Sequence, residues 1–522
     1  MSNIKSACSL LLLAMSFTVY AQTTTPAANR APAIALPTSA DILTPTSPPQ
    51  PWIHGPKIFG VRPGSPFLYT IPATGTRPVK FSADHLPKGL HVNADNGQIT
   101  GSIEKEGTYQ VTLNVKNSLG RASRTFKIVV GESIALTPPM GWNSWNCWHA
   151  DVDQTKIMRS AEGFIKYGLD QHGWTYINID DAWQGKRGGP LNAIQSDSVR
   201  FPDMKGLSDA IHKMGLKLGI YSTPWVQSYA RHVGGSSENA DGSWDPHKVG
   251  NGGRNKKELP YAIGKYSFAK QDAQQWAIWG IDYLKYDWAP NELPETKEMY
   301  DALRASKRDV ILSLSNNATK SLIKEIPGIA KYANSWRISG DISDNWNSLK
   351  THGFGQTDWL PYSSPGHWND PDMFEVGANG GGKPKKLTAN EQYTHISLWC
   401  LLNAPMLLGC DLEHMDDFTL NLLTNDDVID VSQDELGKQA VDVATDTNTD
   451  VYAKPMADGS WSIGLFNRGD ADTDVTIKWA DLKLSGKYQV RDLWRQKDLG
   501  AFADSFTAKV GPHGVVLIKM NK

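Results

Sequence analysis

Ile281-Asp282-Tyr283-Leu284-Lys285-Tyr286-Asp287-Trp288 is the stretch that points most directly to the fold. Its apolar residues predict a buried strand, and the strand ends at the carboxylate of Asp287. Further along the chain, the short strand predicted at 335–338 is followed in the same way by Asp341. In a parallel β/α barrel, the carboxyl ends of the strands form the floor of the active site. We therefore expect both carboxylates at one rim.

Strand and helix patterns alternate around this stretch, from residue 133 to residue 434. The alternation predicts a parallel sheet covered by helices, such as those expected at 153–167 and 268–280. Eight strands with interleaved helices predict a (β/α)8 barrel, or TIM barrel. A doubly wound open sheet is the alternative, but no Gly-rich phosphate loop opens the first unit. The eight predicted strands are 141–145, 176–181, 217–221, 282–287, 310–314, 335–338, 367–373 and 406–411.

Two β domains are predicted to flank the barrel, so the chain is expected to be multidomain. Residues 51–132 contain strands in which apolar and polar residues alternate, with a turn at Asp95-Asn96-Gly97, and predict an Ig-like β-sandwich. Residues 435–522 return to alternating strands and predict a C-terminal antiparallel β-sandwich. The stretch 86–101 resembles Ig-like modules attached to bacterial carbohydrate enzymes. An inert spacer and a weak glycan-binding role both stay open for this module.

The first fifty residues carry two further signals. In residues 1–21, Lys5 precedes an apolar run and Val19-Tyr20-Ala21 offers a cleavage site, which predicts a secretory signal peptide. Residues 22–50 are rich in Pro and Thr and predict a linker. We therefore expect an exported protein, in the periplasm or secreted to the medium. No later run of apolar residues is long enough to predict a membrane span.

The overall composition excludes some classes of partner. The chain has 522 residues, is 21% charged and has a formal net charge of -2. This balance gives no electrostatic reason to expect nucleic acid or an anionic membrane as a partner. Outside the predicted signal peptide, Cys147, Cys400 and Cys410 remain; Cys400 and Cys410 could pair or be buried thiols. The sequence does not predict the oligomeric state.

The predicted strand ends bring together carboxylates, two cations and aromatic side chains. Sugars are bound by this mixture of groups, and glycosidic bonds are cleaved by pairs of acids. The rim therefore predicts a glycoside hydrolase that needs no cofactor. In chain order, the residues are Trp145, Asp180, Asp181, Tyr221, Lys285, Asp287, Arg337, Asp341, Asp372 and Met373.

Each group also has a purely structural interpretation. Asp180-Asp181 could cap a helix or bind a divalent metal. Lys285 and Asp287 could form a structural ion pair, and Arg337 with Asp341 could form a salt bridge at a helix start. Their joint occurrence on one rim favours the functional interpretation.

Six blocks of this region resemble the signature blocks of glycoside hydrolase family 27, which contains α-galactosidases and α-N-acetylgalactosaminidases. They occur in the order and spacing of that family. The resemblance implies a TIM barrel, a C-terminal β domain and a carbohydrate substrate with a terminal α-galactosyl residue. The blocks are 139–145, 179–183, 218–222, 283–287, 336–342 and 368–373.

The resemblance also implies a role for each residue. Asp287 matches the nucleophile and Asp341 the acid/base of a retaining double displacement, which places the two carboxyl groups roughly 5–5.5 Å apart. Asp180 and Asp181 match a clamp on the galactose 4- and 6-hydroxyls, and Lys285 and Arg337 match cations that bind ring hydroxyls. Trp145 and Tyr221 match the aromatic wall of the sugar site. Asp372 and Met373 match residues on the side of the 2-hydroxyl.

The chain departs from the family pattern in two places. Many relatives have a disulfide between a Cys after the nucleophile and a Cys after strand three, where this chain has 288–289 and 223–225 without Cys. The strand-five segment 314–318 also differs from the usual pattern. This leaves the choice among galactose, N-acetylgalactosamine and β-L-arabinopyranose open, although Asp180-Asp181 favours galactose.

Two further expectations concern charge and access. Lys285 is expected to lower the pKa of Asp287, while Asp341 needs burial or the neighbouring Asp287 to raise its pKa, against the effect of Arg337. The long segment 223–267 is expected to lie over the barrel mouth and shape the leaving-group side.

Two other classes of function compete with this one. An inactive glycan-binding protein is disfavoured because both Asp287 and Asp341 are present. A metal-dependent barrel hydrolase that uses Asp180, Asp181 and His367 is disfavoured because the sequence has no His-x-His cluster.

Overall fold

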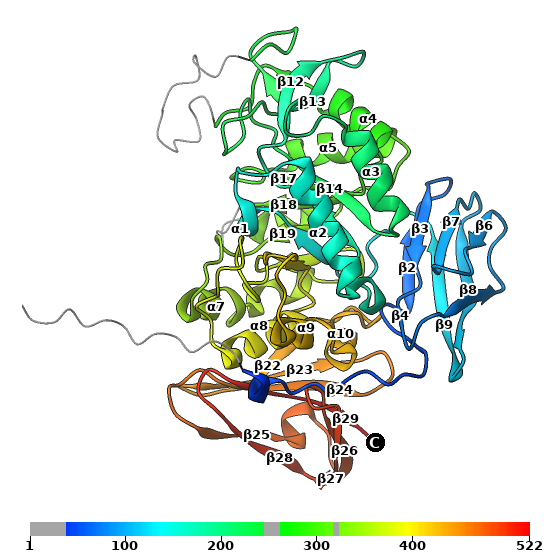
Figure 1. Cartoon of the computed structure of the whole chain (residues 1–522). Helices are drawn as coiled ribbons and strands as arrows, with labels where there is room; N and C mark the ends of the chain where they lie inside the picture. The colour runs from blue at the N-terminus through cyan, green and yellow to red at the C-terminus, as the bar shows by residue number, and fades with distance from the viewer. Residues whose placement is uncertain (1–37, 245–260, 317–322) are drawn as a thin grey trace, which may run out of the picture. The chain divides into compact units, whose positions relative to one another are not determined.

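The computed structural model describes residues 38–244, 261–316 and 323–522. Three sets of elements follow one another along the chain: blue and cyan strands of residues 52–130, cyan to yellow strands and helices of residues 140–432, and orange to red strands of residues 441–521 (Figure 1). The predicted signal peptide and residues 22–37 of the predicted linker lie outside the described residues. Among the described residues, no helix combines the length and the apolar character of a membrane span.

The central set contains an eight-stranded parallel sheet. Its strands are β10 (Met140–Asn143), β11 (Tyr176–Asn178), β14 (Lys217–Ser222), β17 (Tyr283–Asp287), β18 (Ile311–Ser315), β19 (Ser335–Arg337), β20 (Trp368–Asp370) and β21 (Met406–Leu408). Their order is β20-β19-β18-β17-β14-β11-β10-β21. Just beyond β20, the N–H of Phe374 donates to the carbonyl of Leu407 at 2.7 Å, and the N–H of Gly409 donates to the carbonyl of Phe374 at 3.2 Å. These bonds join the two ends of the sheet, and the predicted TIM barrel is confirmed.

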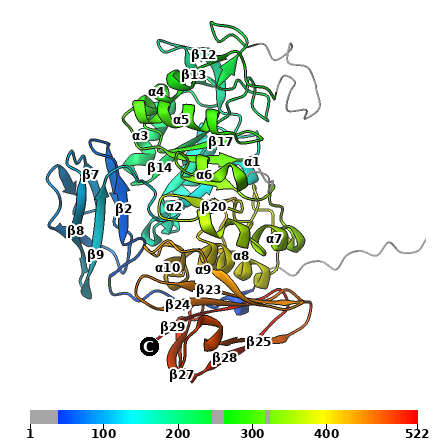
Figure 2. The same cartoon turned by 180° about the vertical axis from the view of Figure 1, so that it is seen from behind.

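Helices cover the outside of the barrel (Figures 1 and 2). In α2, the carboxylate of Asp153 accepts the N–H of Lys156 at 2.9 Å and caps the helix start. Ile157, Ala161 and Phe164 of α2 are buried at helical spacing, which explains why this segment packs as a helix. The helices are α1 (Trp145–Trp148), α2 (Gln154–Lys166), α3 (Met204–Lys213), α4 (Ala269–Trp279), α5 (Leu293–Ala305), α6 (Ile326–Ile329), α7 (Trp346–Gly353), α8 (Ala389–Leu402), α9 (Asp417–Leu423) and α10 (Asp426–Ser432).

Strand β17 shows how the sequence positions the carboxylate of Asp287. Side chains alternate between the two faces of a strand, so Leu284 and Tyr286 share the face opposite to that of Lys285 and Asp287. Leu284 and Tyr286 are buried in the main apolar core, which fixes the strand between its neighbours β14 and β18. The carboxylate of Asp287 is thereby held at the carboxyl end of a rigid strand.

The N-terminal set is an Ig-like sandwich. Its sheets have the orders β2-β9-β8-β5 and β3-β7-β6, and β1 pairs with β4. The β2–β9 pair is parallel, whereas the other pairs of these sheets are antiparallel. The strands are β1 (Trp52–Ile53), β2 (Ile58–Val61), β3 (Phe67–Thr70), β4 (Ala73–Thr74), β5 (Lys80–Asp84), β6 (Leu90–Val92), β7 (Gln98–Gly101), β8 (Gly107–Asn117) and β9 (Gly120–Val130).

The C-terminal set is antiparallel, as predicted. A six-stranded sheet has the order β22-β23-β24-β29-β26-β27, and β25 pairs with β28. Its core is formed by alternating apolar residues such as Val451, Ile463 and Ile477. The strands are β22 (Val441–Thr445), β23 (Thr449–Pro455), β24 (Trp461–Asn467), β25 (Thr473–Lys478), β26 (Lys487–Asp492), β27 (Lys497–Ala503), β28 (Ser505–Val510) and β29 (Val515–Asn521).

The described part of the predicted linker contacts the barrel helices. The N–H of Leu43 donates to Tyr393 Oη at 3.1 Å, and the N–H of Thr44 donates to Asn421 Oδ1 at 3.2 Å. Residues 43 and 44 are therefore held against α8 and α9. Elsewhere in the barrel, Cys147, Cys400 and Cys410 are buried free thiols, so Cys400 and Cys410 are not paired.

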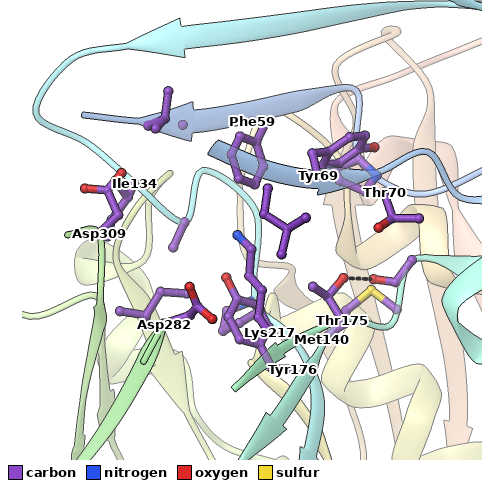
Figure 3. A pocket seen from close by; sticks show the side chains of 18 of the residues that line it. Phe59, Tyr69, Thr70, Ile134, Met140, Thr175, Tyr176, Lys217, Asp282 and Asp309 are labelled. Carbon is purple, nitrogen blue, oxygen red and sulfur yellow. Dashed lines mark hydrogen bonds between the residues drawn. The ribbon is translucent and has the colours of Figure 1, made fainter. Parts of the chain in front are cut away.

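A cavity of about 440 Å³ lies between β2 and β3 of the Ig-like domain and the amino ends of the barrel strands (Figure 3). The Nζ of Lys217 lies 4.7 Å from the ring centre of Phe59 in its wall. Asp282 is the carboxylate that precedes β17, and it pairs with His212 Nε2 at 2.7 Å and with Arg308 at 2.6 Å. In TIM barrels this end of the strands contributes to stability rather than to catalysis.

Candidate active site

A larger cavity, of about 890 Å³, lies at the carboxyl ends of the barrel strands. The structure brings all ten residues predicted from the sequence to its wall. They come from segments that are far apart in the chain, and the closed barrel is what unites them. The ten are Trp145, Asp180, Asp181, Tyr221, Lys285, Asp287, Arg337, Asp341, Asp372 and Met373.

Asp180 lies just beyond β11 and is buried. Its Oδ2 accepts hydrogen bonds from Asn143 Nδ2 and from Lys285 Nζ, both at 2.8 Å. Its Oδ1 accepts the N–H of Asp181 at 2.8 Å. Three of about four acceptor positions of this carboxylate are therefore occupied by the protein.

Asp181 is equally buried and has a different set of partners. Its Oδ1 accepts the N–H of Ala182 at 2.7 Å and Gln184 Nε2 at 3.0 Å, and its Oδ2 accepts the N–H of Ala230 at 2.8 Å. Burial raises the pKa of Asp181, whereas the hydrogen bonds from the protein oppose that rise. The next element is the strand β12 (Gln184–Gly188), so the helix-cap interpretation of Asp180-Asp181 is wrong.

Asp287 is only 4% exposed, at the end of β17. Burial raises its pKa to about 7; Lys285 opposes the rise, and the carboxylates of Asp180 and Asp341 add to it. Lys285 lowers the Asp287 pKa as expected, but the expected net result, a pKa below the usual value, is wrong because desolvation outweighs the attraction of one ammonium group. Lys285 does keep its proton: burial lowers its pKa, but Asp180 and Asp287 more than offset this.

Two polar atoms at the floor of the cavity have no hydrogen-bond partner within the described residues. They are Asp287 Oδ1 and Tyr221 Oη, and both are buried. Burial also raises the pKa of Tyr221 well above its usual range, so the phenol keeps its proton. These two side chains nevertheless act on each other: the phenol of Tyr221 lowers the pKa of Asp287, and the carboxylate of Asp287 raises the pKa of Tyr221. Tyr221 is therefore a neighbour of the Asp287 carboxylate within the cavity.

Arg337 is a second cation in the wall of the cavity, and its side chain is 4% exposed. It pairs with Asp372 Oδ2 at 3.0 Å and with Asp341 Oδ1 at 3.2 Å. The salt bridge that the sequence offered as a structural alternative is therefore present, but Arg337 also fixes Asp372. Asp372 has a φ of +94°, an unfavourable conformation for a residue other than glycine, and its Oδ2 accepts the N–H of Ile342 at 2.8 Å.

Asp341 differs from the other carboxylates because 77% of its side chain is exposed. Of the two surroundings expected for Asp341, burial is absent, whereas the like-charge neighbour Asp287 is present and interacts with it. Asp341 follows β19 at the rim. It does not cap the next helix, because α7 is capped by Asn345, whose side chain accepts the N–H of Ser348. The cavity thus has a buried carboxylate at its floor and an exposed one at its rim.

Several wall residues were not predicted from the sequence. Asp370, at the end of β20, does not line the cavity but lies next to residues that do; burial raises its pKa to about 6, and Arg337 opposes the rise. Glu375 pairs with the buried Lys385 and accepts a hydrogen bond from Asn146. The Trp368–Met373 block signalled the position of Asp370, but nothing in the sequence placed Glu375 on the rim. The other unpredicted wall residues used below are Trp225, Tyr229 and Tyr261.

The metal-site alternative is not supported by the positions of its residues. His367 lies before β20, at the other end of the barrel from Asp180 and Asp181, and its Nδ1 contacts the carbonyl of Ala333 at 2.9 Å. Among the described residues, no group of three His, Cys, Asp or Glu side chains is arranged to hold a metal ion.

The comparison with known families follows the domain order. Residues 137–241 and 254–434 match the family described as alpha galactosidase A. The chain belongs to this family. Residues 446–520 match the alpha galactosidase C-terminal beta sandwich domain, and residues 51–131 match an Ig domain family. This alpha galactosidase A family member is a glycoside hydrolase, as the rim residues predicted.

Relatives of this family member cover most of the chain. Alpha-galactosidase 2 of Arabidopsis thaliana is 34% identical over 76% of this chain and 92% of its own length. A solved structure from Bacteroides fragilis has a TM-score of 0.79 at 30% identity and covers 91% of this chain and 98% of that chain. The β-L-arabinopyranosidase of Geobacillus stearothermophilus, from glycoside hydrolase family 27, has a TM-score of 0.62 at 27% identity, covering 74% of this chain and 97% of that chain.

Proposed function

We propose that this protein is a retaining exo-α-galactosidase that hydrolyses terminal α-D-galactosyl residues from oligosaccharides or polysaccharides. The observation that supports this most strongly is the pairing of a buried Asp287 with an exposed Asp341 in one cavity. A sugar ring bound on the floor would leave its linkage at the rim. Cleavage of a terminal residue, rather than of an internal linkage, fits that arrangement.

In the first step, a carboxylate oxygen of Asp287 attacks the anomeric carbon of the galactosyl residue. The bond from that carbon to the leaving oxygen breaks, and Asp341 gives its proton to the leaving oxygen. Asp287 lines the cavity, where its carboxylate can reach a bound sugar, and the phenol of Tyr221 acts on that carboxylate from the same wall. Lys285, held by Asp180, supplies positive charge beside the nucleophile.

In the second step, Asp341 removes a proton from water. The water oxygen forms a bond to the anomeric carbon, and the bond to Asp287 breaks. Two inversions at one carbon give net retention of the α configuration. Asp341 is exposed at the rim in the free protein, where the leaving oxygen of a bound sugar would lie.

The proposed mechanism predicts how the rate depends on pH. Burial raises the pKa of Asp287 to about 7, and the nucleophile must be ionised. As the pH falls below about 7, Asp287 becomes protonated, and kcat/KM for an aryl α-galactoside should fall about tenfold per pH unit. The measurement is kcat/KM between pH 5 and pH 9, with preincubation at each pH to show that the enzyme stays folded. A constant kcat/KM down to pH 5 would show that Asp287 ionises normally.

A same-family hydrolase for N-acetylgalactosamine or β-L-arabinopyranose is the second candidate. It is favoured by the atypical strand-five segment, of which Asn316 lines the cavity with a φ of +70°. Asn317 and Ala318 of this segment lie outside the described residues. The structural relative from Geobacillus stearothermophilus is named a β-L-arabinopyranosidase, so β-L-arabinopyranose is one sugar to test.

A panel of nitrophenyl glycosides separates these candidates. We expect kcat/KM for the α-D-galactoside to exceed that for the β-L-arabinopyranoside by at least about tenfold, because Asp180 and Asp181 offer acceptors for two hydroxyls and the arabinopyranoside has only one of them. The α-N-acetylgalactosaminide keeps both hydroxyls and differs from the galactoside at carbon 2, so it tests the 2-substituent. A higher value for either competing sugar would replace galactose in the proposal. No cleavage of any of the three would favour an inactive glycan-binding protein.

Export to the periplasm or the medium is also part of the proposal. Lys5 and the apolar run that follows it support this location. An extracellular or periplasmic α-galactosidase would meet oligosaccharides before their uptake. The Ig-like module contains none of the residues proposed for the active site.

A further inference from the structure

The part of segment 223–267 that the structure describes forms a hairpin beside Asp181. Gln227 pairs with Val233, the N–H of Ser228 donates to the carbonyl of His232 at 2.8 Å, and the N–H of Gly234 donates to the carbonyl of Val226 at 2.9 Å. We call residues 225–234 the 225–234 hairpin. Its tip contains Ala230, whose N–H donates to Asp181 Oδ2.

Three aromatic side chains connect this hairpin to the next described segment. Trp225 lies 5.1 Å from Tyr229 and 5.1 Å from Tyr261 between ring centres, and Tyr229 lies 5.5 Å from Tyr261. The backbone supports the same contact, because Trp225 pairs with Ile263. All three rings line the catalytic cavity. Aromatic clusters of this kind contribute packing beyond simple burial, so they fix the position of the hairpin.

The hydrogen bonds of the two adjacent carboxylates differ in origin. Asp180 is bound by Lys285, from the strand that carries Asp287, and by Asn143 from β10. Asp181 instead receives its Oδ2 bond from the hairpin, outside the barrel sheet. The side chain of Ser228, also in the hairpin, gives Asp181 a further hydrogen bond. The orientation of Asp181 therefore depends on the hairpin as well as on Ala182 and Gln184, whereas that of Asp180 depends on the barrel strands.

We infer that the 225–234 hairpin, held by Trp225, Tyr229 and Tyr261, positions Asp181 to bind the exocyclic hydroxymethyl group of the sugar. This inference rests on the proposed function, in which Asp180 and Asp181 receive the 4- and 6-hydroxyls. Asp180 is tied to the strands near the reacting carbon, so the more peripheral 6-hydroxyl falls to Asp181. In this inference the 225–234 hairpin lies on the side of the bound sugar; residues 245–260 of the segment expected on the leaving-group side lie outside the described residues.

The hydroxymethyl group provides a selective test. A β-L-arabinopyranoside has the ring of an α-D-galactoside without this group, so it cannot form the bond to Asp181. The three aromatic residues act as positioning residues in this inference, and loosening the hairpin should weaken galactoside recognition selectively. A general loss of folding would instead lower the rates for both sugars alike.

The experiment compares Tyr261→Ala with the matched control Tyr261→Phe, which keeps the ring. The readout is kcat/KM for the nitrophenyl α-D-galactoside divided by kcat/KM for the nitrophenyl β-L-arabinopyranoside. We expect this ratio to fall about tenfold or more in Tyr261→Ala, about the effect of one lost hydrogen bond, and to change less than twofold in Tyr261→Phe. An unchanged ratio in Tyr261→Ala overturns the inference, whether both rates are kept or both fall together.

A second pair of variants tests the hydrogen bond itself. Ala230→Pro removes the N–H that Asp181 accepts, whereas Ala230→Gly keeps it. The same ratio should fall in Ala230→Pro and be retained in Ala230→Gly; equal ratios in the two variants would contradict the inference. The proposed function is tested separately by the parent enzyme. If the parent prefers the arabinopyranoside, the assignment of galactose fails before any variant is compared.

Discussion

Replacing Asp287 with Asn is expected to lower kcat for an aryl α-galactoside by about 10⁴-fold or more, the scale seen when an enzyme loses its nucleophile. An amide cannot form the covalent intermediate, although its shape is nearly that of the carboxylate. The measurement is single-turnover and steady-state hydrolysis of the nitrophenyl α-galactoside. The matched control is Asp370→Asn, which also removes a buried carboxylate charge of this rim and can still accept the N–H of Asp372.

The control should lose at least about a hundredfold less activity than Asp287→Asn, because Asp370 is not proposed to touch the reacting carbon. Chemical rescue adds a second criterion. In Asp287→Gly, azide should attack the anomeric carbon as its bond to the leaving oxygen breaks, and the product should be the β-galactosyl azide. Activity of Asp287→Asn within tenfold of the parent would contradict the role of this residue.

Replacing Asp341 with Asn is expected to give a loss that depends on the leaving group. Proton transfer by a positioned acid contributes about 10²- to 10⁴-fold, and it matters most when the leaving group is a poor one. For an oligosaccharide such as raffinose, kcat/KM should fall about 10³-fold or more. For an activated aryl galactoside, whose phenolate leaves without protonation, the loss in kcat/KM should be at least about tenfold smaller.

The control for this experiment is Asp344→Asn. Asp344 follows Asp341 closely, and its carboxylate accepts the N–H groups of Lys386 and Leu387 rather than facing the reaction. It should not show a dependence on the leaving group. Equal losses on raffinose and on the aryl galactoside in Asp341→Asn would indicate that Asp341 has a structural role through Arg337 instead of a catalytic one.

The barrel could be predicted from the sequence because each strand is a short apolar run that ends in a polar residue. The run that ends at Asp287 illustrates this, since burial of Leu284 and Tyr286 leaves no other position for the carboxylate. The closure of the sheet into a barrel was harder to predict from the sequence. It depends on Phe374, which lies beyond β20 and pairs with Leu408 over a long separation in the chain.

The site residues could be predicted because they are adjacent to strand ends, but their electrostatics could not. The effect of Lys285 on Asp287 is visible in the sequence, whereas the burial that outweighs it depends on the packing of the whole barrel mouth. Asp341 was expected to have either burial or Asp287 as a like-charge neighbour; it is exposed at the rim and has that neighbour. The contact of Ala230 with Asp181 is formed by a hairpin whose register no local pattern specified.

The central claim is that Asp287 attacks the sugar while Asp341 acts on the leaving oxygen. It is tested most directly by trapping the intermediate with a fluorinated α-galactosyl fluoride, followed by proteolysis and mass spectrometry. The account predicts that the label is found on the carboxylate of Asp287, and that the Asp287→Asn variant is not labelled. A label on Asp341 or on another residue of the parent enzyme would contradict it.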